Sequence, residues 1–158
     1  MGNYKNLEID FIQRTLDLIA QYESALYKYE YKEQYNYTLL INCLLGLIVL
    51  PKEKSLTYLP SNILDEKMRT EMGLINSVIN TEYKTLSKLI IALRHSISHF
   101  NIQIISDLDD EFGIDQIIFE VDDEKSKIQV ANFRANELLP FVRYYSNWLL
   151  SNIEKYKK

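Results

Sequence analysis

Residues 81–100, TEYKTLSKLIIALRHSISHF, have the clearest structural pattern in the sequence. The apolar residues of this stretch recur at intervals of three and four, which is the spacing of one face of an α-helix. The spacing predicts a helix over about 81–99. The apolar stripe consists of Leu86, Leu89, Ile90, Leu93, Ile97 and Phe100.

The same helical spacing appears before and after this stretch. It predicts helices over about 5–32, 36–50 and 64–79, and a last helix from about Ala135 onward. Pro51 ends the second of these helices because proline cannot continue a helix, and a loop is expected up to Pro60.

Between about 102 and 133 the apolar period changes from helical spacing to alternation, as in Ile102 and Ile104 or Ile128 and Val130. Alternation between turn residues is typical of strands, so a small antiparallel meander is expected here. The sequence therefore predicts a mainly α fold over residues 1–158. It would be one helical bundle with a β insertion before the last helix.

Length and composition limit the class of protein. A chain of 158 residues is about one domain long and can bury a core. Cys43 is the only cysteine, which favours a buried thiol in a reducing compartment over a disulfide. The most apolar run, Leu39–Leu50, has 12 residues, whereas a bilayer span needs roughly 20. With no secretory signal at the start, we expect a cytoplasmic protein without a membrane segment.

The net charge of −4 is unevenly distributed. Nine acidic residues and no base lie between Asp107 and Glu124, and we interpret this block as a solvated loop and hairpin. Without it, the remaining chain has more bases than acids. A local basic surface is therefore possible, although no continuous phosphate-tracking stripe is present.

Tyrosines are concentrated near the start, where seven of the twelve precede Thr38. They could stack on bases or form a partner surface, but packing along the first two helices is the favoured interpretation.

The polar face of the helix over 81–99 carries the residues best suited to chemistry. At 100° per residue, Arg94, His95, Ser98 and His99 lie opposite the apolar stripe, and the two histidines are one turn apart. Cleavage of RNA by its own 2′-hydroxyl needs a base, a cation near the phosphoryl oxygens and an acid for the leaving 5′-oxygen. An imidazole titrates near neutral pH, and a guanidinium is a permanent cation whose planar fork fits a phosphate.

One motif supplies one well-placed histidine, whereas the reaction needs both a base and an acid. His95 could be the second group. Two copies of the motif facing each other across a twofold axis would solve the problem more generally, and twofold dimers are the commonest oligomers. We therefore expect a composite site at a homodimer interface.

Other chemistries have less support. His95 and His99 could hold zinc with a carboxylate from the acidic block, but no third histidine or cysteine pair is present. Cys43 as a nucleophile with His99 lacks a supporting pattern. The four glycines never lie close together, so a glycine-rich phosphate loop is not expected. No metal or cofactor is predicted.

Residues 94–99, RHSISH, resemble the signature of HEPN domains: Arg, then Asn, Asp or His, then three residues, then His. Residues 42–53, NCLLGLIVLPKE, resemble a prokaryotic HEPN subfamily that is often associated with plasmids or defence. In that subfamily strands commonly follow the motif before a last helix. The resemblance implies an up-and-down helical bundle.

The resemblance also implies a metal-independent endoribonuclease, toxin-like or active in phage defence, with paired motifs in a dimer. Arg94 would stabilise the phosphate, and His99 would be the acid–base residue. His95 would orient these two, with Ser98 and Asn101 as supporting residues.

Two further possibilities follow from the resemblance. A cognate antitoxin or defence-system partner is possible. HEPN toxins with a nucleotidyltransferase antitoxin typically have a tyrosine two residues after the histidine, where this chain has Asn101. Some HEPN domains only bind RNA or a protein partner, and such a non-catalytic module is the alternative function.

Overall fold

The computed structural model describes residues 4–49, 59–106, 113–124 and 126–153. The helices are α1 (Leu7–Ala25), α2 (Asn36–Val49), α4 (Glu66–Glu71), α5 (Leu86–Ser98) and α6 (Leu138–Ile153). The strands are β1 (Val78–Ile79), β2 (Ile102–Ser106), β3 (Ile114–Asp123) and β4 (Ser126–Arg134). Short 3₁₀ turns are η1 (Leu26–Lys28), η2 (Tyr31–Glu33), η3 (Thr81–Tyr83) and η4 (Ala135–Glu137).

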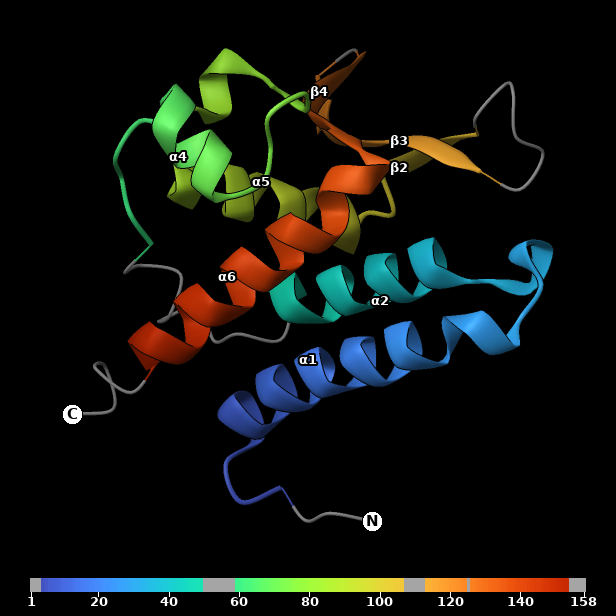
Figure 1. Cartoon of the computed structure of the whole chain (residues 1–158). Coiled ribbons are helices and arrows are strands. Elements are labelled where there is room, and N and C mark those ends of the chain that lie inside the picture. The colour runs from blue at the N-terminus through green and yellow to red at the C-terminus, as the bar shows by residue number, and fades with distance from the viewer. Residues whose placement is uncertain (1–3, 50–58, 107–112, 125, 154–158) are drawn as a thin grey trace.

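Three long helices pack against one another, and a fourth connects them to the sheet (Figure 1). α1, α2 and α6 contact each other pairwise, whereas α5 contacts α2 on one side and β3 on the other. The mainly α class with a small antiparallel sheet is thereby confirmed. α5, which carries the histidines, lies at the boundary between helices and sheet.

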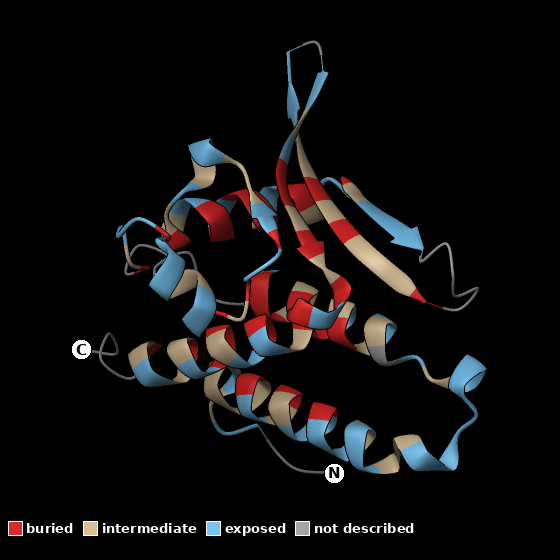
Figure 2. Cartoon of the chain, turned by 45° about the horizontal axis from the view of Figure 1, so that its top comes forward, coloured by how far each residue is buried: buried red, intermediate tan, exposed pale blue. Residues whose placement is uncertain are grey.

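The strands form one antiparallel sheet in the order β1-β4-β3-β2. β2 follows α5 directly and forms an edge, with Ile102 opposite Phe119 and Ile104 opposite Ile117. Figure 2 shows buried residues where β3 and β4 lie against the helices and exposed residues toward the tip of their hairpin. Three of the four strands lie in the segment where alternation predicted a meander.

A row of aromatic rings connects the sheet to α6. Phe119 on β3 lies 5.5 Å from Phe133 on β4, and Phe133 lies 5.2 Å from Phe141 on α6, between ring centroids. The Phe141 ring stacks on Tyr145 at 6.2 Å. All four side chains are almost fully buried, so this row fixes the sheet against the last helix.

The helix predicted over 64–79 is much shorter in the structure. α4 ends at Glu71, and Gly73 takes a left-handed conformation with φ of 73°. Ile75 is 63% exposed, and the chain continues into strand β1. The prediction was wrong because it relied on the apolar spacing alone. Gly73 ends the helix and turns the chain toward the sheet.

The helix predicted over 5–32 ends at Ala25 and gives way to η1 and η2. About half or more of the side-chain surface is exposed in four tyrosines: Tyr27, Tyr29, Tyr31 and Tyr35. Packing is therefore the wrong interpretation for these four rings.

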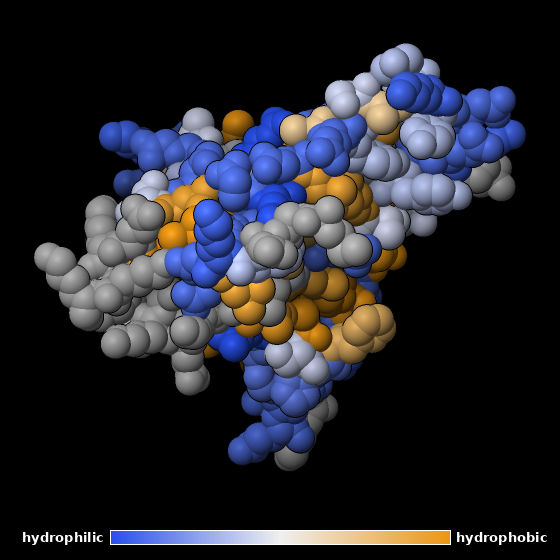
Figure 3. Space-filling model, turned by 90° about the horizontal axis from the view of Figure 1, so that it is seen from below, coloured by the Kyte–Doolittle hydropathy of each residue, from blue (hydrophilic) through white to orange (hydrophobic). Residues whose placement is uncertain are grey.

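Figure 3 shows the face on the α1 side, where apolar patches alternate with hydrophilic residues.

The second predicted helix agrees with α2, while Leu50 and the predicted loop up to residue 58 lie outside the described residues. Residues 107–112, the first part of the acidic block, also lie outside them. In the described ranges, no helix has the length and apolar character needed to cross a bilayer.

Gly73→Ala is expected to lower the free energy of unfolding by about 1–3 kcal/mol. A Cβ at this position would lie 2.2 Å from Cβ of Pro140, and the left-handed backbone disfavours any L side chain. Gly46→Ala is the matched comparison, because its Cβ would meet only the end of the Phe11 side chain at 2.9 Å. Urea unfolding of both variants checks this, and an equal loss in the two would contradict it.

Candidate active site at the end of helix α5

Local interactions at both ends fix the position of α5. Thr85 caps the first turn, with Oγ1 accepting a hydrogen bond from N–H of Lys88 at 3.2 Å. At the other end, N–H of Phe100 donates to O of Ile97 at 3.0 Å, and N–H of Asn101 donates to O of Ser96 at 2.8 Å. This pair of bonds is a Schellman motif, so the helix stops one residue before His99.

The two histidines lie together on the exposed end of this helix. Their ring centroids are 4.4 Å apart with 46° between the planes, and both side chains are exposed. The polar face predicted from the sequence therefore brings the imidazoles into direct contact. His99 is the C-terminal cap of the helix, and its N–H donates to O of His95 at 3.1 Å.

Arg94 is half-buried and lies on the side of the helix that faces α6. Burial raises the pKa of the Tyr145 hydroxyl in α6, and the charge of Arg94 partly opposes that rise. Within the described residues, this hydroxyl has no hydrogen-bond partner. Arg94 is thus in the same turn as the histidines, but its side chain is more buried than theirs. The sequence predicted an exposed position for all three residues.

Ser98 and Asn101 have different surroundings. Ser98 is exposed, and its Oγ donates to O of Arg94 at 2.8 Å within the same helix. Asn101 is buried; its Nδ2 donates to Oδ2 of Asp122 at 2.9 Å, and its Oδ1 accepts from Nζ of Lys127 at 2.7 Å. Asn101 therefore joins the end of α5 to the β3–β4 hairpin.

Ser96, in the middle of the motif, makes a second connection to the sheet. It is fully buried; its Oγ donates to O of Asn101 at 2.7 Å and accepts from N–H of Glu120 at 3.1 Å. Ser96 could not be identified from the sequence, because a serine within a helical pattern carries no signal of its own. Its contacts fix where the two neighbouring imidazoles lie relative to β3.

A shallow groove of about 720 Å³ runs along the helix beside His95. Lys88 and Ile91 share its α5 wall with His95, since residues three, four and seven apart lie on one helix face. The other lining residues are Glu82, Tyr83, Ala92, Val121 and Asp122. Lys88 could have been found by extending the polar face by two turns, whereas Asp122 comes from the distant strand β3 and Glu82 from η3, just before the helix.

Phe100 is the residue that the sequence placed wrongly. The spacing assigns it to the buried stripe, but the helix ends before it, and the side chain is 85% exposed. Its φ of 57° makes it the one non-glycine residue with positive φ in the described ranges. The left-handed conformation costs an L residue about 1–2 kcal/mol.

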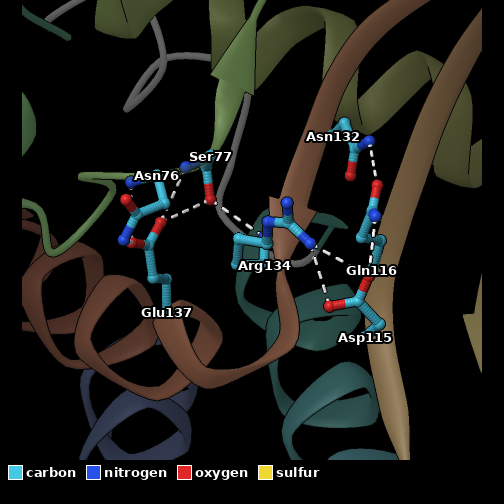
Figure 4. Close-up of polar contacts among 7 residues, drawn as sticks. All are labelled: Asn76, Ser77, Asp115, Gln116, Asn132, Arg134 and Glu137. Atoms are coloured by element: carbon cyan, nitrogen blue, oxygen red, sulfur yellow. Dashed lines mark hydrogen bonds and ion pairs between the residues drawn. The ribbon is translucent and has the colours of Figure 1, made fainter. Parts of the chain in front are cut away.

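A second polar cluster lies away from the motif and fixes the chain before α5 (Figure 4). The Glu137 carboxylate accepts hydrogen bonds from the backbone and side chain of both Asn76 and Ser77, at 2.7–2.9 Å. Burial would raise the pKa of Glu137, but these hydrogen bonds outweigh it, so the pKa is below its usual value. Glu137 therefore stays charged while almost fully buried.

An ion pair lies beside this cluster. Nη1 of Arg134 is 2.9 Å from both carboxylate oxygens of Asp115. The hydrogen bond from Gln116, and then the charge of Arg134, lower the pKa of Asp115. One residue of the acidic block is therefore paired rather than simply solvated.

The structure offers little support for the two other kinds of site considered, a cysteine nucleophile and a metal site. Cys43 is buried, as predicted, and burial raises the pKa of its thiol, which disfavours the nucleophilic thiolate. Within the described parts of the chain, no three His, Cys, Asp or Glu side chains gather as metal ligands.

Comparison with known proteins identifies the family. The family model described as HEPN pEK499 p136 matches residues 1–156. Searches of curated proteins and of solved structures found no match. Because the family match spans almost the whole sequence, the chain belongs to the HEPN family, in the group described as pEK499 p136.

Proposed function

We propose that the protein is a metal-independent endoribonuclease in which Arg94 and His99 are the catalytic residues. The observation that carries this proposal is the contact between the His95 and His99 rings at the exposed end of α5, directly after Arg94, in a HEPN chain. These are the acid–base and cationic groups that transesterification of RNA needs.

In the proposed reaction the 2′-oxygen of RNA attacks the adjacent phosphorus while the bond from phosphorus to the 5′-oxygen breaks. One imidazole takes the proton of the 2′-hydroxyl, and an imidazolium gives a proton to the leaving 5′-oxygen. The products are a 2′,3′-cyclic phosphate and a 5′-hydroxyl. Arg94 would stabilise the negative phosphoryl oxygens, and His95 would orient His99 through their ring contact.

We further propose that the working site is composite. Two copies of the motif in a homodimer would place a base and an acid on opposite sides of one phosphate. Light scattering at the assay concentration should give a dimer. An active monomer would contradict this part of the proposal.

We also propose that the whole chain is a single HEPN domain and that the protein is cytoplasmic. Its helices form the up-and-down bundle of the family, and strands β2–β4 are an insertion before α6. A toxin or phage-defence role, with a cognate partner, fits this activity. Position 101 offers a buried, bonded amide where nucleotidylated toxins have a tyrosine, so regulation there is not proposed.

Incubation of the purified protein with single-stranded RNA in EDTA tests the activity. Cleavage by the wild type, and its loss in both Arg94→Ala and His99→Ala, is the expected result. Full activity in the two variants would point to a contaminating nuclease and would contradict the proposal.

Lys88→Glu is expected to raise KM for RNA about 10-fold with little change in kcat. The Lys88 side chain is exposed and lines the groove beside His95, so it can contact a phosphate near the cleaved one. The substitution removes that attraction and adds repulsion between the carboxylate and the phosphate. A 10-fold rise in KM corresponds to about 1.4 kcal/mol of binding free energy. Lys84→Glu makes the same charge change at an exposed residue outside the groove lining and should have a much smaller effect. Equal effects would indicate a general charge effect.

A non-catalytic HEPN module is the second candidate function. Glu82 and Asp122 line the groove beside His95, and this acidity favours a basic protein segment over RNA. RNA or partner binding that survives His99→Ala, with no cleavage by the wild type, would favour this function.

A further inference from the structure

Phe100 combines two features that each cost the domain free energy. It is the most exposed large apolar side chain among the described residues, at 85%, and its backbone is left-handed. Position C′ of a Schellman motif favours glycine because glycine has no Cβ to clash. A phenyl ring there costs free energy without burying apolar surface.

The location of Phe100 points to a ligand at the motif. The residue directly follows His99, whose ring contacts His95. Strained backbone conformations are concentrated at functional sites. Two other exposed rings, Tyr27 and Tyr31, lie in η1 and η2, in the segment between α1 and α2 and not at the end of α5.

We propose that Phe100 is a base-stacking residue that holds one nucleobase of single-stranded RNA beside the phosphate presented to Arg94 and His99. This inference rests on the proposed function and names how its substrate is positioned. Attack by a 2′-hydroxyl in line with the leaving oxygen requires the neighbouring bases to be unstacked from each other. An aromatic ring next to the acid–base residue replaces the lost stacking, and it accepts any base because every base has a π-face.

A nucleotide fits this position better than a second copy of the chain. In the composite site proposed above, the two motifs must face one cleft that stays open to RNA, and a partner copy seated on the ring directly after His99 would close that cleft. A nucleotide places its phosphate and hydroxyl groups against these same imidazoles. The ring and the acid–base groups are then used together.

Phe100→Gly is the decisive variant because it removes the ring and relieves the backbone. Its melting temperature should equal or exceed that of the parent, so loss of function cannot come from unfolding. Binding is measured in the His99→Ala background, by fluorescence anisotropy of a short labelled single-stranded RNA. Removal of one stacking contact should weaken RNA affinity about 5-fold to 150-fold. In the cleavage-competent protein, the same change should raise KM more than it lowers kcat.

Two further variants sharpen the test. Phe100→Trp should retain RNA affinity, and its added fluorescence should be quenched by RNA, with wild-type Trp148 as the background signal. Tyr27→Ala removes a ring that is 81% exposed in η1 and should leave the affinity unchanged.

The outcomes separate the inference from the proposed function. If the wild type does not cleave RNA but Phe100→Gly weakens binding, the stacking role holds and the nuclease proposal fails. If the wild type cleaves through His99 while Phe100→Gly changes neither affinity nor KM, the stacking role is wrong. Dissociation of a dimer in Phe100→Gly would also overturn it and would assign the ring to a second copy.

Discussion

His99→Ala is expected to lower the rate of RNA cleavage at least about 100-fold, because loss of a general acid–base residue typically costs 10²–10⁴ in rate. The imidazole is exposed at the end of α5, so the fold should be unaffected. Initial rates on a labelled single-stranded RNA, with circular dichroism of each variant, measure both quantities.

Two controls accompany this prediction. Ser98→Ala removes the exposed hydroxyl of a supporting residue, which donates to O of Arg94, and it should lower the rate far less than His99→Ala. Arg94→Lys keeps the positive charge but loses the planar fork, so an intermediate rate is expected. A His99→Ala rate within a few fold of the wild type would contradict the assignment.

Glu137→Ala is expected to have the largest effect on stability, lowering the free energy of unfolding by roughly 2–4 kcal/mol. Four donors of Asn76 and Ser77 lose their shared acceptor, and the donors of Ser77 are buried. Glu124→Ala, at an exposed position near the tip of the β3–β4 hairpin, is the control and should change little. Chemical denaturation of both variants measures their free energies of unfolding. Similar denaturation midpoints for the two variants would show that the Glu137 cluster does not stabilise the fold.

The Glu137 carboxylate also predicts the sign of a pH effect. Its folded pKa is below the ordinary value of 4.5, so the folded protein binds the proton less readily than the unfolded chain. The stabilisation is therefore present above about pH 4.5 and is lost as pH falls through the lower folded pKa. Glu137→Gln should show a smaller loss of stability between neutral pH and this acidic range than the wild type.

Much of the fold follows from local patterns in the sequence. α2, α5 and α6 combine regular apolar spacing with clear ends, and the alternation after Asn101 indicates strands. The segment after Leu64 misled this reasoning because its apolar residues keep helical spacing beyond Gly73. A buried carboxylate sixty residues away, Glu137, binds the chain at Ser77 just before strand β1, and no local pattern can report such a contact.

The candidate site was predictable in its residues but not in its surroundings. The helical period alone brings His95 and His99 together, and the structure has them in contact. The exposure of Phe100 depends on where the helix stops, which the hydrogen bonds of its last turn decide. The link from Ser96 to β3 depends on tertiary packing and leaves no pattern in the sequence.

The chemistry of the RNA ends shows whether the protein cleaves RNA without a metal. Purified wild-type protein is incubated with a defined single-stranded RNA in EDTA, and the products are analysed by mass spectrometry beside those of His99→Ala. We expect 2′,3′-cyclic phosphate and 5′-hydroxyl ends with the wild type, and intact RNA with the variant. Intact RNA with both proteins, or 3′-hydroxyl ends, would contradict the proposed function.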